Sequence, residues 1–124
     1  MKDKRPVNLD ISTIQLPLPA ITSILHRISG VIIFVGIGIL LWIFETSIET
    51  EAGFNALKTG LSSPFIKFLL WGIFSALAYH LIAGCKHLLM DIGLGESLAG
   101  GLLGAKLTIF ISTLGIIVIG IWIW

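Results

Sequence analysis

Three stretches of this chain contain no Asp, Glu, Lys or Arg, and each is close to the length that crosses a bilayer. They are residues 28–44, 68–85 and 107–124. A helix needs about 20 apolar residues to span a hydrocarbon core of about 30 Å. With 56% hydrophobic and 12% charged residues and a mean hydropathy of +1.02, the chain lacks the polar surface of a soluble domain. The sequence therefore predicts an all-α integral membrane protein with three transmembrane helices.

The breaks between the apolar runs set the expected helix boundaries. Residues 1–19 form a lead-in whose three prolines disfavour a continuous helix. The polar segment 45–64, with its Gly and Pro breaks, predicts a loop, and the glycine-rich segment 91–105 predicts a flexible turn. These glycines do not indicate a nucleotide site, because no strand precedes them and no basic residue follows at P-loop spacing. We expect one membrane domain, residues 1–124, with helices at about 20–46, 65–90 and 105–124.

The basic residues are distributed unevenly between the two predicted sides of the membrane. One side would hold Lys2, Lys4, Arg5, Arg27, Lys86 and Lys106. The other would hold Lys58 and Lys67, with Glu45, Glu49 and Glu51. By the positive-inside rule, we expect a cytoplasmic N-terminus and a C-terminus on the outer side, which is the periplasm for a bacterial inner membrane. In a mitochondrial membrane, the basic side would face the matrix. We expect no signal peptide, because the basic start runs into Pro-containing sequence without a short apolar core. The lone Cys85 is expected to be a packing residue.

His80 is the ionisable residue that interrupts the second apolar run. Lipid offers an imidazole no hydrogen-bond partner, so His80 must face protein, water or a cofactor. Small residues share its helical stripe, together with a second histidine; they are Gly72, Ala76, Ala83, Gly84 and His87. Such a stripe would admit a flat macrocycle, and histidine is a common axial ligand of haem iron. The same stripe also suits close helix packing, so haem ligation and interhelical hydrogen bonding both remain open.

The depth of His80 bears on how a haem would be ligated. His80 lies six residues before Lys86, or about 9 Å along the helix, which places it in the cytoplasmic half. His87 is about 10 Å further along the same helix, too far to bind the other face of the same iron. We expect His26 to be similarly displaced in depth. A haem with two histidine ligands would therefore need its second ligand from another chain.

A second polar cluster lies at the start of the first predicted helix. Its members are Thr22, Ser23, His26, Arg27 and Gly30. The guanidinium of Arg27, together with an imidazole, would suit the haem propionates, and the cluster is on the same side as His87. Ser23, one turn before Arg27, could donate to a quinone carbonyl. The plainer interpretation, which these residues alone favour, is that Arg27 reaches lipid phosphates and Ser23 bonds a helix carbonyl.

Short motifs occur in a specific order along the chain. They are Arg5-Pro6-Val7, Ser23-Ile24-Leu25-His26-Arg27-Ile28-Ser29-Gly30, Ala78-Tyr79-His80 and His87-x3-Asp91. In this order and spacing, the chain resembles the cytochrome b membrane-anchor subunit of succinate dehydrogenase, respiratory complex II. The resemblance covers essentially the whole chain and includes three helices and a cytoplasmic N-terminus. The departures are Lys86, where the family usually has arginine, and Cys85, where an aliphatic residue is more usual.

The resemblance implies one haem b, held between this chain and a second small membrane anchor. His80 would be the axial ligand from this chain, and the partner anchor would supply the other. His26 and Arg27 would meet the propionates, while Ser23 and Arg27 would line a ubiquinone site beside the iron–sulfur subunit. Succinate oxidation would occur on the flavoprotein subunit, so this chain would contribute anchoring, haem binding and part of the quinone site.

Two alternatives remain beside this hypothesis. The first is the anchor of a fumarate reductase that uses menaquinone, because the chemistry is reversible and the sequence carries no marker of direction. The second is a non-redox helical assembly subunit whose polar intramembrane residues only join helices. The coincidence of His80, its small-residue stripe and the His26–Arg27 pair argues against the second.

Overall fold

The computed structural model describes residues 9–10 and 12–124, and in this part of the chain every regular element is a helix. The helices are α1 (Leu18–Glu49), α2 (Glu51–Gly60), α3 (Pro64–Asp91) and α4 (Leu98–Ile123). The three long helices have 32, 28 and 26 residues, and each is long and apolar enough to cross a membrane. The prediction of an all-α protein with three membrane spans is therefore confirmed. The predicted cytoplasmic residues Lys2, Lys4 and Arg5 lie outside the described residues.

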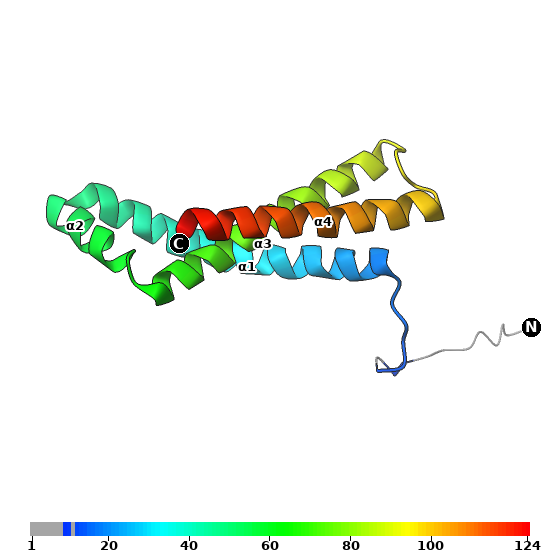
Figure 1. The fold of residues 1–124 in the computed structure, drawn as a ribbon, viewed down its shortest axis with the longest axis horizontal. Helices are drawn as coiled ribbons and strands as arrows, with labels where there is room; N and C mark the ends of the chain where they lie inside the picture. The colour runs from blue at the N-terminus through cyan, green and yellow to red at the C-terminus, as the bar shows by residue number, and fades with distance from the viewer. Residues whose placement is uncertain (1–8, 11) are drawn as a thin grey trace, which may run out of the picture.

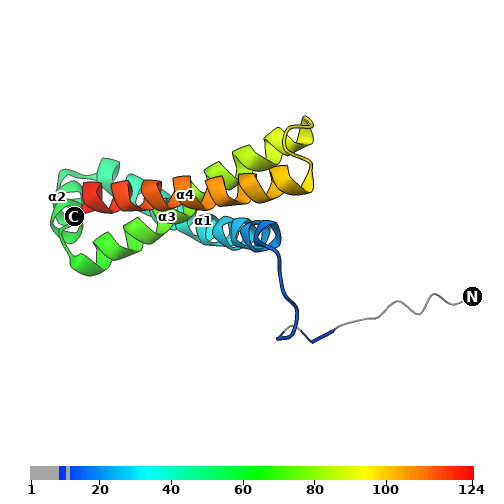
Figure 2. The same ribbon diagram turned by 45° about the vertical axis from the view of Figure 1, so that its right-hand side comes forward.

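The three long helices lie alongside one another, and each packs against the other two (Figure 1). The start of α1 and the turn between α3 and α4 lie at one end of the bundle. The short helix α2, which packs against α1, lies at the other end together with the C-terminus (Figure 2). Each long helix thus connects the same two ends of the molecule.

Most of the buried residues between the long helices are small. The buried positions of α1 are Thr22, Ser29 and Gly36, which are seven residues apart and so lie on one stripe. The buried positions of the other two helices are Ile73, Ala76, Ala83, Ala105, Thr108 and Ser112. A Cβ on Gly36 would lie 2.8 Å from Ile73 Cγ2, so α1 and α3 approach closely there. Most large apolar side chains point outward, as expected where lipid replaces a soluble protein's core.

The prediction of a loop over residues 45–64 is wrong for most of its length. α1 continues to Glu49, and α2 begins at Glu51 after a single extended residue, Thr50. The Thr50 hydroxyl accepts a hydrogen bond from the Gly53 amide at 2.9 Å and so caps α2. Polar residues exclude a segment from lipid but do not prevent it from being helical in water. The composition of this segment therefore predicts that it leaves the lipid, but it does not predict whether the segment is helical.

The glycine-rich turn is also shorter than expected. α4 begins at Leu98 rather than near residue 105, because Ser97 caps it by accepting a hydrogen bond from the Gly100 amide. Gly93 and Gly95 have φ values of 87° and 78°, a region that favours glycine. A Cβ on Gly100 would lie 2.8 Å from Gly95 Cα. Glycines therefore form the turn at 93–95 and allow the first turn of α4 to approach it.

Candidate functional site

His80, in the middle of α3, is fixed by two oxygen atoms of α1. Its Nδ1 lies 3.0 Å from Ser29 Oγ and 3.1 Å from the carbonyl oxygen of His26. Ser29 Oγ in turn donates to the same His26 carbonyl at 2.7 Å. Ser29 is only 5% exposed, so this contact is shielded within the interface between α1 and α3. One edge of the imidazole is therefore held by the backbone and a side chain of the neighbouring helix.

These contacts assign the proton on the His80 ring. A carbonyl oxygen only accepts hydrogen bonds, so both Ser29 Oγ and His80 Nδ1 donate to His26. The lone pairs of Ser29 Oγ then accept part of the same Nδ1–H. A neutral imidazole protonated on Nδ1 has its free lone pair on Nε2. In the described part of the chain, no hydrogen bond to His80 Nε2 is formed, so this lone pair is available to a ligand.

The other two histidines lie beside His80. The His26 ring stacks on the His80 ring, with centroids 4.0 Å apart and planes 18° apart, and it lies 5.2 Å from the His87 ring. The expectation that His26 lies at a different depth from His80 is therefore wrong. Its side chain reaches along the interface toward α3, and a distance estimated from flanking charges does not capture that reach. The three rings form one cluster, in the order His80, His26, His87.

Two glycines leave the space that these rings occupy. A Cβ on Gly30 would lie 3.1 Å from His80 Cε1, and a Cβ on Gly84 would lie 3.6 Å from His26 Nε2. The first distance is shorter than ordinary van der Waals contact, whereas the second is within it. Gly30 is thus needed for the position of the His80 ring. Gly84, a member of the predicted small-residue stripe on α3, borders the His26 ring.

The polar cluster at the start of α1 divides between two directions. Thr22 is buried, its hydroxyl donates to the Pro19 carbonyl, and its own carbonyl accepts from Tyr79 Oη at 2.9 Å. His26 also faces α3, but Arg27 is exposed. Ser23 is half-buried. The structure therefore brings His26 to His80 and leaves Arg27 at the surface.

Ser23 and Arg27 have no protein partner in residues 9–10 and 12–124. Neither forms a hydrogen bond there, and Arg27 forms no ion pair. By contrast, Thr22, Ser29 and Thr108 all bond a carbonyl three or four residues earlier in their own helix. The plainer interpretation of Ser23, in which it bonds a helix carbonyl, does not hold here. Residues four apart share a helix face, so the Ser23 hydroxyl and the Arg27 guanidinium lie on the same side of α1.

His26 also carries an unsatisfied polar atom. Its Nε2 is buried and has no hydrogen-bond partner among the described residues. A buried polar group without a partner costs free energy, about 1–3 kcal/mol, unless a water or ligand satisfies it. This orphan nitrogen belongs to the ring that stacks on His80, so it lies within the histidine cluster.

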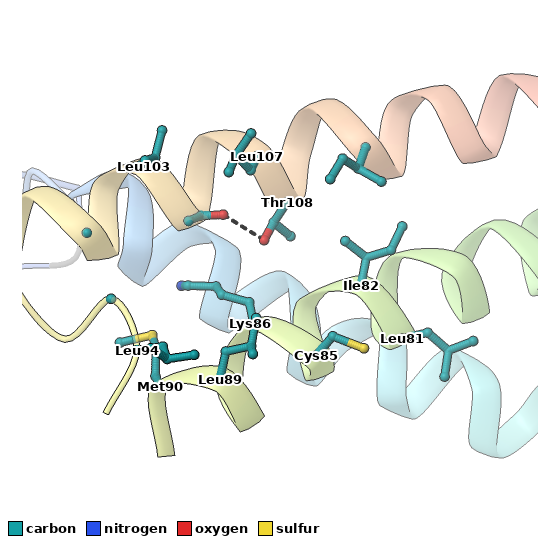
Figure 3. Close-up of a pocket in the computed structure, with 14 residues that line it drawn as sticks. Leu81, Ile82, Cys85, Lys86, Leu89, Met90, Leu94, Leu103, Leu107 and Thr108 are labelled. Atoms are coloured by element: carbon teal, nitrogen blue, oxygen red, sulfur yellow. Dashed lines mark hydrogen bonds between the residues drawn. The ribbon is translucent and has the colours of Figure 1, made fainter. Parts of the chain in front are cut away.

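A separate cavity lies between α3 and α4 (Figure 3). It has a volume of about 540 Å³ and mostly apolar walls, to which Leu81, Leu89 and Leu107 contribute. Lys86 crosses it toward α4, and its Cε would lie 3.4 Å from a Cβ on Gly104. None of the three histidines lines this cavity. The side chain of Lys86 is thus directed toward α4.

Sequence reasoning gave no separate role to two residues of the site. Ser29 and Tyr79 are part of the sequence motifs, and both join α1 to α3 by hydrogen bonds. A signal for Ser29 was present, since it lies one turn after His26 within an otherwise charge-free run. Nothing in a single sequence shows that its hydroxyl faces His80.

The fold and the histidine cluster define a multi-pass membrane protein with a potential ligand site between two of its spans. Residues 1–119 match the family of the succinate dehydrogenase/fumarate reductase transmembrane subunit. The chain is 37% identical over 125 residues to a succinate dehydrogenase cytochrome b556 subunit of Coxiella burnetii, with both chains fully covered. A Paracoccus denitrificans subunit of the same name is 34% identical over 94 residues, 76% of this chain and 72% of the relative.

The chain therefore belongs to the succinate dehydrogenase/fumarate reductase transmembrane subunit family. A Rickettsia bellii relative, also a succinate dehydrogenase cytochrome b556 subunit, is 35% identical over 96 residues, 77% of this chain and 74% of the relative. The resemblance found in the motifs is confirmed. The three apolar helices and the bacterial relatives also confirm a multi-pass protein of the bacterial inner membrane, of the cytochrome b subunit type.

Proposed function

We propose that this chain is the haem b-binding anchor subunit of a succinate dehydrogenase and helps to form its ubiquinone site. The observation that carries the proposal is the hydrogen bonding of the His80 ring. Its Nδ1–H is engaged by α1, and its Nε2 lone pair has no partner in the described residues. Histidines that bind metals almost always donate their other ring N–H to a carbonyl or similar group. His80 has this arrangement inside a membrane-spanning helix.

The residues present fit one face of a haem. No three His, Cys, Asp or Glu side chains of the described residues could together hold a metal ion. A haem needs less from the protein, because the porphyrin supplies four ligands and the chain adds only an axial one. His80 would hold the iron through Nε2. The bound haem would supply a one-electron carrier within the membrane.

The second axial ligand would come from another subunit. His26 is adjacent to His80, but the two rings are stacked face to face at 4.0 Å. The lone pair of an imidazole nitrogen lies in the plane of its ring, so two rings stacked face to face do not direct their nitrogens at a common atom between them. We therefore assign the other ligand to a second small membrane anchor.

His26, Arg27 and His87 would interact with the haem propionates. The buried Nε2 of His26 lacks a partner in the described residues, and a carboxylate would satisfy it if it is protonated. His87 lies beside His26, at 5.2 Å between ring centroids. The exposed guanidinium of Arg27, one residue along α1, would supply a permanent positive charge at the same end.

Ser23 and Arg27 would contribute to the ubiquinone site. Both are free of protein partners within the described residues, and they lie on one face of α1. A hydroxyl and a guanidinium are donors suited to the carbonyl oxygens of a quinone. The iron–sulfur subunit would dock at this end and deliver electrons, while succinate would be oxidised on the flavoprotein subunit.

The orientation in the membrane follows from the charges. We assign the end with Arg27, Lys86 and Lys106 to the cytoplasm and the C-terminus to the periplasm. The whole chain, residues 1–124, would then act as one anchor domain. The soluble subunits would bind on its cytoplasmic side, near Ser23 and Arg27.

Reduced-minus-oxidised spectroscopy tests this function. The chain is co-expressed with its partner subunits, the complex is purified, and its visible spectrum and succinate–ubiquinone reductase activity are measured. We expect a sharp b-type α band and quinone reduction. A stable complex with no haem band would favour the non-redox assembly role instead.

The alternative of a menaquinone-linked fumarate reductase has support in the family description, which names both enzymes. Extraction of quinone from the purified complex distinguishes the two. Ubiquinone together with faster succinate oxidation would support the proposed direction, whereas menaquinone together with faster fumarate reduction would support the alternative.

Gly30→Ala should reduce the haem content of the assembled complex. The added Cβ would lie 3.1 Å from His80 Cε1, so the ring would have to shift by a few tenths of an ångström and its hydrogen bonds with α1 would be disturbed. A displaced axial ligand binds iron more weakly, by about 10- to 100-fold when supporting contacts are disturbed. Gly38→Ala is the matched control, because the same change on the same helix meets nothing within 4 Å. Equal haem in both variants would contradict the prediction.

A further inference from the structure

We infer that Ser29 is a positioning residue that tunes His80 as an iron ligand, an inference that rests on the proposed haem site. Ser29 does not face the proposed ligand position; it lies on the Nδ1 side of the imidazole at 3.0 Å. Because it is 5% exposed, water does not readily replace it there. Its action would therefore pass through the His80 ring.

The hydroxyl of Ser29 has a defined direction. Its hydrogen points to the His26 carbonyl at 2.7 Å, so its lone pairs remain for the Nδ1–H of His80. Nδ1–H thus has two acceptors, Ser29 Oγ and the His26 carbonyl. This arrangement fixes both the ring orientation and the tautomer that leaves Nε2 free. Loss of the hydroxyl would leave one acceptor, which is part of the α1 backbone and cannot be removed by substitution.

An acceptor at Nδ1–H increases the electron density of the imidazole and makes Nε2 a stronger donor. A stronger donor stabilises ferric more than ferrous iron and so lowers the midpoint potential of a haem. Loss of the Ser29 hydroxyl should therefore shift the haem potential to more positive values. The remaining His26 carbonyl should still hold the ring, so most of the haem should stay bound.

A buried hydroxyl can also serve packing alone, and the chain offers a matched example. Ser112 on α4 is 2% exposed, and its Oγ has no hydrogen-bond partner in the part of the chain that the structure describes. Ser112→Ala removes a hydroxyl of similar burial without altering any contact of His80. A purely structural effect of losing a buried hydroxyl should appear equally in both alanine variants.

The test is a redox titration of the haem in purified, co-expressed complexes. The variants are Ser29→Ala, Ser29→Thr, Ser29→Cys and Ser112→Ala, with His80→Leu as the reference for the haem site itself. Haem content, the position of the α band and the electron paramagnetic resonance signal of ferric haem are recorded with the midpoint potential. Ser29→Thr restores the hydroxyl. Ser29→Cys keeps a group of similar shape with a weak acceptor and extends the test if the alanine variant does not assemble.

The inference is supported if Ser29→Ala raises the midpoint potential, Ser29→Cys shifts it in the same direction, and Ser29→Thr returns it toward the wild-type value, with Ser112→Ala unchanged. It is overturned if the Ser29→Ala and Ser29→Cys potentials match wild type while His80→Leu lacks the band. That result would leave the proposed function intact. A wild-type complex without haem, or a band unchanged in His80→Leu, would instead overturn the His80 assignment on which the inference rests.

Discussion

The His80→Leu variant is expected to lose the b-type haem band from the assembled complex. Leucine has similar bulk but no lone pair, so it can fill the space between α1 and α3 without binding iron. Haem with one axial ligand removed should be lost during purification or show a shifted α band. The measurement is a dithionite-reduced minus oxidised spectrum, normalised to the flavoprotein content of the same sample.

Tyr79→Phe provides the neighbouring control for this result. It removes one hydrogen bond between α3 and α1, from Tyr79 Oη to the Thr22 carbonyl, and keeps the aromatic ring. We expect this variant to retain the haem band. If His80→Leu kept an unchanged band, the ligand would have to be His26, His87 or a residue of another subunit.

Replacement of Arg27 by Leu should selectively impair quinone reduction. Removal of a charge-assisted hydrogen bond costs about 1.5–3 kcal/mol, which corresponds to a decrease of about 10- to 150-fold in succinate–ubiquinone reductase activity. Succinate oxidation with an artificial dye as acceptor should remain close to wild type, because the flavoprotein is unaffected. Ser23→Ala should act in the same direction with a smaller decrease, since it removes a neutral donor.

Lys106→Leu is the control for the loss of an exposed cation at the same end of the bundle. Lys106 is exposed on the first turns of α4, and we assign it no part in the haem or quinone site. It should leave both activities unchanged. Equal loss of the quinone and dye activities in Arg27→Leu would indicate defective assembly and contradict the assignment of Arg27 to the quinone site.

The histidine cluster was predicted from the sequence only in part. His80 was identified as a candidate ligand because an imidazole in an uncharged membrane span needs a partner. The prediction that His26 lies at a different depth is wrong, because position along a helix does not give the reach of a side chain. Its ring stacks on His80 because the side chain extends along the interface. Side-chain direction across an interface depends on how two helices pack, which the spacing within each helix does not contain.

The polar segments show a related limit. Glycines and acidic residues predicted a loop before α3 and a long turn before α4, but α2 and the first turns of α4 are helical. The residue before each helix decided the outcome, because Thr50 and Ser97 cap the helices that follow. Composition indicates whether a segment leaves the lipid, whereas capping decides where its helices begin.

The sequence by itself determined the number of membrane spans, the family and the candidate residue His80. An apolar run of sufficient length without charged residues predicts a membrane span, because the bilayer has a fixed thickness and requires backbone hydrogen bonds within each helix. Only the tertiary structure decided which face of α1 meets α3, and hence that Ser29 and His26 contact His80 while Ser23 and Arg27 do not. Small buried residues on both helices set that rotation through close packing.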